Sequence, residues 1–259
     1  MRSLEKALLI SAFFYVPTTL AFDCPADHFD ETATVKSIHD GDTLKLSDGR
    51  KIRLIGINTP ELARDNQPAE PYAEQARSSL NQLIKQSGHQ VKLVYGRDRQ
   101  DKYRRTLAHL YLASGQNIQA QLIKQGLATA FTTPPNDRQA RCYRAMEQTA
   151  IQQQLGIWSL ENYQIQASDK LPEDSKGFRR IEGQVLETYQ NKKSFWIHLS
   201  GDINIRIASD DIKYFDRNQL QQLKDKTIRI RGWLHPKKKG YFINLRHPDA
   251  LSLISPSKH

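Results

Sequence analysis

Two short segments of the chain combine the residue types that phosphoryl chemistry requires. Asp40-Gly41-Asp42-Thr43 carries two carboxylates, and the stretch from Arg53 to Glu61 adds a guanidinium, an amide and another carboxylate about ten residues later. A hard cation needs oxygen ligands, a phosphorus centre that gains charge needs guanidinium donors, and water needs a carboxylate to orient it. From Asp-Gly-Asp alone, an ordinary acidic hairpin turn is the better interpretation.

A third segment changes that balance. Asp101-Lys102-Tyr103-Arg104-Arg105-Thr106-Leu107-Ala108 leads into a predicted strand and can fold over the same barrel mouth. With it, the chain from about Thr32 to Trp158 resembles the thermonuclease family, whose namesake is staphylococcal nuclease. The motifs Asp-Gly-Asp-Thr, Arg-x-x-x-x-(Asp)-Thr-Pro-Glu and Asp-(Lys/Arg)-Tyr-x-Arg-x-Leu-Ala occur in the family's order and at its spacing.

The resemblance implies a calcium site, with Mg²⁺ as the alternative cation. It implies that Asp42 binds the ion through its carboxylate and Thr59 through its backbone oxygen, with Asp40 supporting them. The family usually has an Asp where this chain has Asn58, so a neutral amide replaces one charged ligand. Because ligand charge tunes calcium affinity, we expect this site to bind the metal more weakly.

The resemblance also implies the catalytic residues. Arg53 and Arg105 would clamp the scissile phosphate, and Glu61 would orient or deprotonate the attacking water. Lys102 and Tyr103 would contact a neighbouring phosphate or nucleotide. Two guanidinium groups and a dication stabilise the charge that develops on the phosphate, which is the largest contribution available to this reaction.

The elements that position these residues follow from hydrophobic periodicity. Strand-like alternation, broken by Asp-Gly turns, precedes an amphipathic helix that starts at Pro71 and runs to Gly88, and two more strands follow it. This order is expected of a five-stranded barrel of the oligonucleotide/oligosaccharide-binding (OB) type, completed by two helices. The predicted strands are Ala33–Ile38, Thr43–Leu46, Lys51–Ile57, Gln90–Val94 and Thr106–Leu112, and the helices are Ile118–Lys124 and Asn136–Gln154.

The same order of elements appears again after a polar stretch without periodicity. We predict an α+β, mainly β protein: a signal peptide (1–21), a nuclease-like domain (22–158), a linker (159–177) and a smaller OB-like barrel (178–259). The second set of elements comprises strands Ile181–Thr188, Ser194–Leu199, Ile203–Ala208, Thr227–Leu234 and Tyr241–Leu245, with a helix at Asp210–Leu223.

The net charge of +10 is concentrated in the second barrel. Residues 176–259 contain seventeen Lys/Arg against eight Asp/Glu, whereas residues 1–175 contain twenty-one against twenty. Arg229 and Arg231 alternate with Ile along one strand, and Lys237–Lys239 lies near Trp233 and Tyr241. Cations beside aromatic rings suit single-stranded nucleic acid, whereas a solvated hairpin with an edge blunted by Lys is at least as good an interpretation.

The first residues indicate export. Arg2 and Lys6 precede an apolar run, Ala7–Val16, and Thr19-Leu20-Ala21 is a small-x-small cleavage pattern. The alternative is a retained anchor, but the uncharged stretch is short for a bilayer span. We therefore expect a secreted or periplasmic protein without integral membrane association after cleavage.

Cys24 and Cys142 are the two cysteines of the chain. In an oxidising compartment a bridge between them is expected, worth about 4–5 kcal/mol in the chain-entropy picture, and two free thiols are the alternative.

Together these features predict an exported, monomeric, metal-dependent nuclease that hydrolyses DNA and/or RNA. The main alternative is a catalytically weak or inactive nucleic-acid-binding protein, which the retained Arg53, Glu61 and Arg105 oppose and Asn58 favours. An envelope-binding lipoprotein ranks last, because no acylation pattern precedes Cys24.

Overall fold

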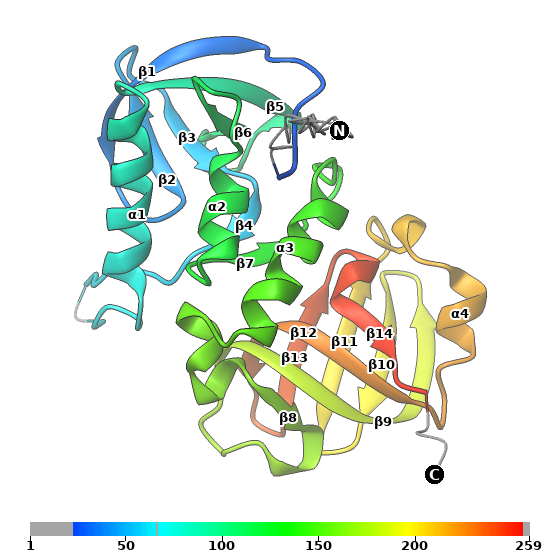
Figure 1. Cartoon of the computed structure of the whole chain (residues 1–259). Helices are drawn as coiled ribbons and strands as arrows, with labels where there is room; N and C mark the ends of the chain where they lie inside the picture. The colour runs from blue at the N-terminus through cyan, green and yellow to red at the C-terminus, as the bar shows by residue number, and fades with distance from the viewer. Residues whose placement is uncertain (1–22, 66, 256–259) are drawn as a thin grey trace, which may run out of the picture.

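A computed structural model describes residues 23–65 and 67–255 of the chain (Figure 1). The predicted signal peptide lies outside the described residues. Within them, no helix is long and apolar enough to cross a membrane.

The first barrel is closed and has the predicted OB arrangement. Its strand order is β1-β2-β3-β6-β5, with β3 and β6 parallel and all other neighbours antiparallel. Alternating residues such as Leu44, Ile52 and Leu93 point inward and are fully buried. The strands are β1 (Glu31–Ile38), β2 (Thr43–Leu46), β3 (Lys51–Leu54), β5 (Gln90–Gln100) and β6 (Thr106–Leu112).

Three helices pack against this barrel: α1 (Ala73–Gln86), α2 (Ile118–Lys124) and α3 (Ala140–Gln152). Helix α1 begins two residues after Pro71, because Tyr72 adopts the left-handed conformation with φ of 70°. Helix α3 is shorter than predicted, since a turn precedes its first residue.

The predicted strand Lys51–Ile57 is split into β3 and a separate strand, β4 (Gly56–Asn58). Gly56 has φ of 84°, and a Cβ there would lie 2.6 Å from the ring of Tyr143, so only glycine fits this bend. Strand β4 pairs with β7 (Thr129–Phe131), a strand that the sequence analysis did not predict.

A disulfide joins Cys24 to Cys142 in α3, with a Cα–Cα distance of 5.6 Å. It fixes the start of the described chain against the last helix of the first barrel. The expectation of a bridge, rather than of two free thiols, agrees with this structure.

The second barrel has the same strand order as the first. Strand β9 pairs with β10, β10 with β11, β11 in parallel with β13, β13 with β12, and β12 closes back onto β9. The prediction of two OB-type barrels is therefore confirmed. These strands are β9 (Gly177–Asn191), β10 (Ser194–Leu199), β11 (Ile203–Ala208), β12 (Thr227–Pro236) and β13 (Tyr241–Leu245).

Several short elements surround this barrel. The predicted helix Asp210–Leu223 is divided into η4 (Ile212–Tyr214) and α4 (Arg217–Gln221), because Phe215 is extended between them. The stretch expected to be a linker contains η2 (Glu161–Tyr163), β8 (Ile165–Ala167) and η3 (Ser168–Lys170), and β8 adds to the sheet beside β9. The remaining elements are η1 (Gly156–Ser159), η5 (Pro248–Ala250) and β14 (Leu251–Leu253).

Candidate active site

Neighbouring strands bring the three motif segments to one place. Thr43 on β2 pairs with Arg53 on β3, and Arg53 pairs with Leu107 on β6. Arg105 lies immediately before β6, and its Nη1 is 3.4 Å from Thr43 Oγ1. The segment from Asp101 to Ala108 therefore returns to the barrel mouth, as the sequence analysis expected.

Asp42 lies at the centre of this site and is buried. Its Oδ2 accepts a hydrogen bond from the backbone N–H of Thr59 at 3.1 Å and is 3.0 Å from Arg53 Nη2. Its Oδ1 accepts from the Thr43 hydroxyl at 3.1 Å. The turn that carries Asp42 can pack against α1 because Gly41 has no side chain: a Cβ there would lie 2.7 Å from Ala76 Cβ.

Arg53 holds the neighbouring oxygen atoms together. Its guanidinium donates to the carbonyl oxygens of Leu54 and Ile57 and to Asn58 Oδ1, the last at 3.0 Å. The Asn58 amide in turn donates to the carbonyl oxygen of Thr59 at 3.3 Å. The three expected metal ligands, Asp42, Asn58 and Thr59, thus form one hydrogen-bonded group around Arg53.

Carboxylates concentrate negative charge at this group. Burial raises the pKa of Asp42, the nearby Asp40 adds to that rise, and Arg53 opposes it. Asp40 also accepts the backbone N–H of Asp42 through its side chain at 3.0 Å. Within residues 23–65 and 67–255, no three His, Cys, Asp or Glu side chains form a metal-binding cluster, so a cation here would also need carbonyl and amide oxygens.

Glu61 lies on the exposed loop that follows β4. Partial burial raises the pKa of its carboxyl group, and the charges of Asp42, Asp40 and Glu70 raise it further. Two hydrogen bonds fix the backbone here: Glu61 N–H donates to the Glu70 carboxylate at 3.0 Å, and Glu70 N–H donates to the Glu61 carbonyl at 2.9 Å. A carboxylate with a raised pKa, near the buried Asp42, is suited to accepting a proton from water.

Asp101 positions Arg105. Its Oδ2 accepts from Arg105 Nε at 2.7 Å, and its Oδ1 accepts the backbone N–H groups of Tyr103 and Arg105. Burial would raise the pKa of Asp101, but these bonds from Arg105 outweigh it and lower the pKa. Tyr103 is 68% exposed, with Lys102 Nζ 5.0 Å from its ring centre, so both side chains are open to a ligand.

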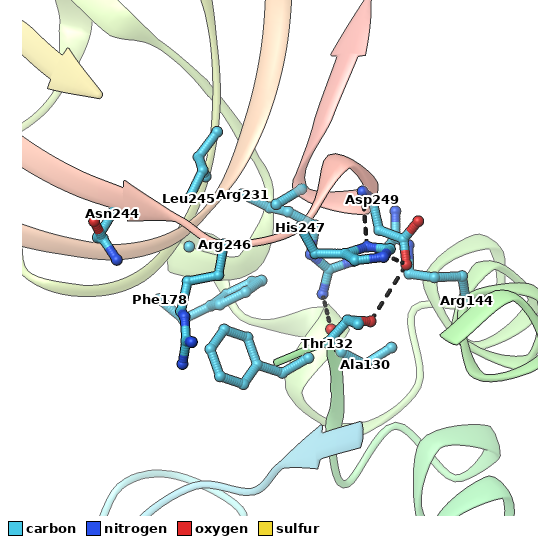
Figure 2. A pocket seen from close by; sticks show the side chains of 13 residues that line it. Ala130, Thr132, Arg144, Phe178, Arg231, Asn244, Leu245, Arg246, His247 and Asp249 are labelled. Carbon is cyan, nitrogen blue, oxygen red and sulfur yellow. Dashed lines mark hydrogen bonds and ion pairs between the residues drawn. The ribbon is translucent and has the colours of Figure 1, made fainter. Parts of the chain in front are cut away.

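The sequence analysis missed the link between this site and the second barrel. Strand β7 pairs with β4, which carries Asn58, and Glu147 of α3 accepts the Ala130 N–H of β7 at 2.8 Å. Arg231 of β12 donates to the Ala130 carbonyl at 3.1 Å (Figure 2). It also donates to Glu147 Oε1 at 2.7 Å. Burial raises the pKa of Glu147 to about 7, against the opposing effect of Arg144.

One signal in the sequence pointed to Glu147. It lies on the same helix face as the buried Tyr143 and Ala150, four residues before it and three after it. A charged residue on an apolar helix face requires a buried partner. The partner, Arg231, belongs to the strand for which the sequence offered two interpretations, a surface for single-stranded nucleic acid and a solvated hairpin.

Arg231, Trp233 and Tyr241 do not form an open surface for stacking single-stranded nucleic acid. Arg231 is buried against Glu147, and Arg229 donates to Glu182 at 2.7 Å. Trp233 packs edge-on against Phe131 of β7, with ring centres 4.8 Å apart, and Tyr241 is buried. Arg231 and Trp233 join the two barrels, whereas the partly exposed Arg229 stabilises the sheet through its pair with Glu182.

Comparison with known proteins agrees with this geometry. Residues 51–160 match the family described as staphylococcal nuclease homologue. The chain is 37% identical over 159 residues to a thermonuclease of Staphylococcus intermedius, covering 60% of this chain and 93% of that protein. It is 37% identical over 128 residues to endonuclease YncB of Bacillus subtilis (48% of this chain, 60% of that protein) and 31% identical over 133 residues to a thermonuclease of Staphylococcus hyicus (50% and 77%). The chain therefore belongs to the thermonuclease family and is a nuclease.

Proposed function

We propose that this protein is an exported, metal-dependent nuclease that hydrolyses phosphodiester bonds of DNA and/or RNA at the site around Asp42. The observation that supports this most is the group formed by Asp42, Arg53, Asn58 and Thr59, with Glu61 and Arg105 at its edge.

The donor set fits a hard dication. Asp42 and Asp40 supply negative charge, and the oxygens of Asn58 and Thr59 complete an all-oxygen set of the kind that Ca²⁺ prefers, with Mg²⁺ as the alternative. Burial raises the pKa of Asp42, so a bound cation would compete with a proton for this carboxylate. A bound dication would neutralise phosphate charge and polarise the phosphoryl oxygen.

The protein's own residues perform the proton transfer and the charge stabilisation. Glu61 takes a proton from water while the water oxygen attacks phosphorus, and the P–O ester bond breaks with its electron pair leaving on the sugar oxygen. The sugar oxygen takes a proton from solvent, and Glu61 returns its proton to solvent. Arg53 and Arg105 donate to the phosphate oxygens as charge accumulates there. Asp101 keeps Arg105 at the mouth, and Lys102 and Tyr103 contact the adjoining nucleotide.

The alternative is a protein that binds nucleic acid on this fold with weak or no catalysis, for which Asn58 is the motivating residue. Digestion of plasmid DNA and of RNA by the mature, disulfide-bonded chain distinguishes the two, with Ca²⁺, with Mg²⁺ and with excess chelator. We expect cleavage with a dication and none with chelator. Glu61→Gln is the control for a contaminating nuclease, and binding without cleavage under every condition would support the alternative.

The arrangement that accompanies this function is a cleaved signal (1–21), a catalytic domain (22–158), a connecting segment (159–177) and a basic OB-like domain (178–259). The disulfide between Cys24 and Cys142 supports export, because such bonds persist in oxidising compartments. We propose a secreted or periplasmic monomer.

A further inference from the structure

A cavity of about 110 Å³ lies where α3 meets the outer face of β9 and β12. Four arginines line it: Arg144 of α3, Arg180 of β9, and Arg229 and Arg231 of β12. Drug-sized ligands occupy pockets of roughly 300 Å³ or more, so this one suits a small ion or a single group of a larger molecule.

The backbone places two of these arginines directly opposite each other. Arg231 and Arg180 are partners across the antiparallel pair of β12 and β9, so their side chains leave the same face of the sheet. Like charges in this position repel and destabilise a sheet unless an anion compensates them. Arg144 approaches the same face from the helix, which adds a third positive charge.

Carboxylates of the protein pair with three of the four arginines. Glu147 pairs with both Arg144 and Arg231, and Glu182 pairs with Arg229. Asp249 also lines the cavity; its carboxylate lies 3.1 Å from His247 Nδ1 and accepts the Thr132 hydroxyl (Figure 2).

Arg180 is the exception. In the described part of the chain its side chain forms no ion pair with a carboxylate. It donates one hydrogen bond, to the Tyr163 carbonyl at 3.4 Å, and its guanidinium carbon lies 5.7 Å from the centre of the Trp158 ring. Burial lowers its pKa, and Arg229 and Arg144 lower it further, while Glu147 acts in the opposite direction. A half-buried guanidinium with three neighbouring guanidinium groups and unused donors faces this cavity.

We propose that the cavity binds one phosphate group, with Arg180 as its principal ligand. The guanidinium fork matches phosphate oxygens. The four arginines outnumber the carboxylates of Glu147, Glu182 and Asp249 by one, which matches the single charge of a phosphodiester. The group is either free phosphate or a backbone phosphate of nucleic acid, and the second source rests on the proposed nuclease function. No residue of the site around Asp42 lines this cavity.

Calorimetric titration of the full, disulfide-bonded chain with inorganic phosphate at constant low ionic strength tests the site. We expect Arg180→Gln to weaken phosphate binding at least tenfold. Arg217→Gln on α4 removes the same charge from an exposed position that does not line the cavity, and we expect it to have less than a twofold effect. Arg105→Gln, which alters the candidate active site, should leave this binding event in place.

Arg229→Gln serves as a second variant, because its partner Glu182 is partly exposed and the fold does not depend on a buried pair there. We expect it also to weaken phosphate binding. Equal phosphate affinity in Arg180→Gln and Arg217→Gln, or loss of binding in Arg105→Gln alone, would overturn the proposal. The titration requires no catalysis, so an inactive chain that still binds phosphate through Arg180 would refute the proposed function and leave this site intact.

A salt series with a single-stranded oligonucleotide identifies the source of the phosphate. Each backbone phosphate contacted by the protein contributes about 0.7 to the slope of log affinity against log salt. If the nucleic-acid backbone occupies the cavity, Arg180→Gln lowers the slope by about that amount and Arg217→Gln does not. An unchanged slope together with lost phosphate binding identifies free phosphate as the ligand.

Discussion

Replacing Arg231 with Met should strongly destabilise the protein, because it leaves a buried carboxylate with less compensation. Glu147 is fully buried. Arg231 donates two hydrogen bonds to the Glu147 carboxylate and a third to the Ala130 carbonyl. Removing one partner of a buried ion pair costs about 3–5 kcal/mol. With an m-value of about 3 kcal/mol per M of urea, the unfolding midpoint should fall by about 1 M or more.

Arg229→Met is the matched control for this experiment. It lies two residues earlier on the same strand, and its pair with the partly exposed Glu182 is worth at most about 1 kcal/mol. Urea unfolding followed by tryptophan fluorescence gives the loss of stability in both variants. Adding Glu147→Gln to Arg231→Met should recover much of the stability, since the glutamine keeps an acceptor for Ala130 N–H and removes the buried charge. If Arg231→Met costs no more than Arg229→Met, this account of the interface is wrong.

Four further predictions follow from other contacts. Asn58→Asp should increase metal affinity by adding a ligand charge, and an unchanged metal titration midpoint would argue against Asn58 as a ligand. Arg105→Ala should lower kcat by about two to three orders of magnitude with a smaller effect on KM, measured on a short oligonucleotide; a change in KM alone would assign Arg105 to binding. Burial, with Arg138 adding to it, lowers the pKa of His109 to about 3, so the unfolded chain binds a proton that the folded chain does not between pH 6.5 and 3. The free energy of unfolding should therefore fall by up to about 5 kcal/mol as the pH is lowered from 6.5 to 3. In His109→Gln, the free energy of unfolding should depend less on pH over this range. Replacing Cys24 and Cys142 with Ser opens a loop of 118 residues and should cost up to about 5 kcal/mol, measured against the oxidised protein in urea.

The parts of the structure that the sequence predicted are those with local signals. Alternation located β2 and β10 to the residue, and the Asp-Gly turns that flank Thr43–Leu46 indicated tight connections. The three motif segments indicated which strand ends carry polar groups. The order of elements was then sufficient to predict two OB-type barrels.

The parts that were missed depend on contacts between distant segments. Strand β7 has three residues, and its partner β4 lies about seventy residues earlier, so no local pattern marks it. The alternation of Arg229 and Arg231 with Ile correctly indicated a strand with one polar face. It could not indicate that α3 covers this face, because the alternation is the same whether that face meets water or a buried carboxylate.

The bond between Cys24 and Cys142 encloses the loop that carries Glu61. Arg64 on this loop has a side chain that is 84% exposed, which makes the following peptide bond an accessible target for a protease that cuts after basic residues. Cleavage there would produce two polypeptides that stay covalently joined, because the cut falls between the two bridged cysteines. The part of the first barrel before the cut, β1 to β4, and the part after it, which includes β5 and β6, would remain covalently linked. In an oxidising environment a cut in this loop therefore does not by itself separate Asp42 and Arg53 from Arg105, and release of the fragments requires a reductant as well.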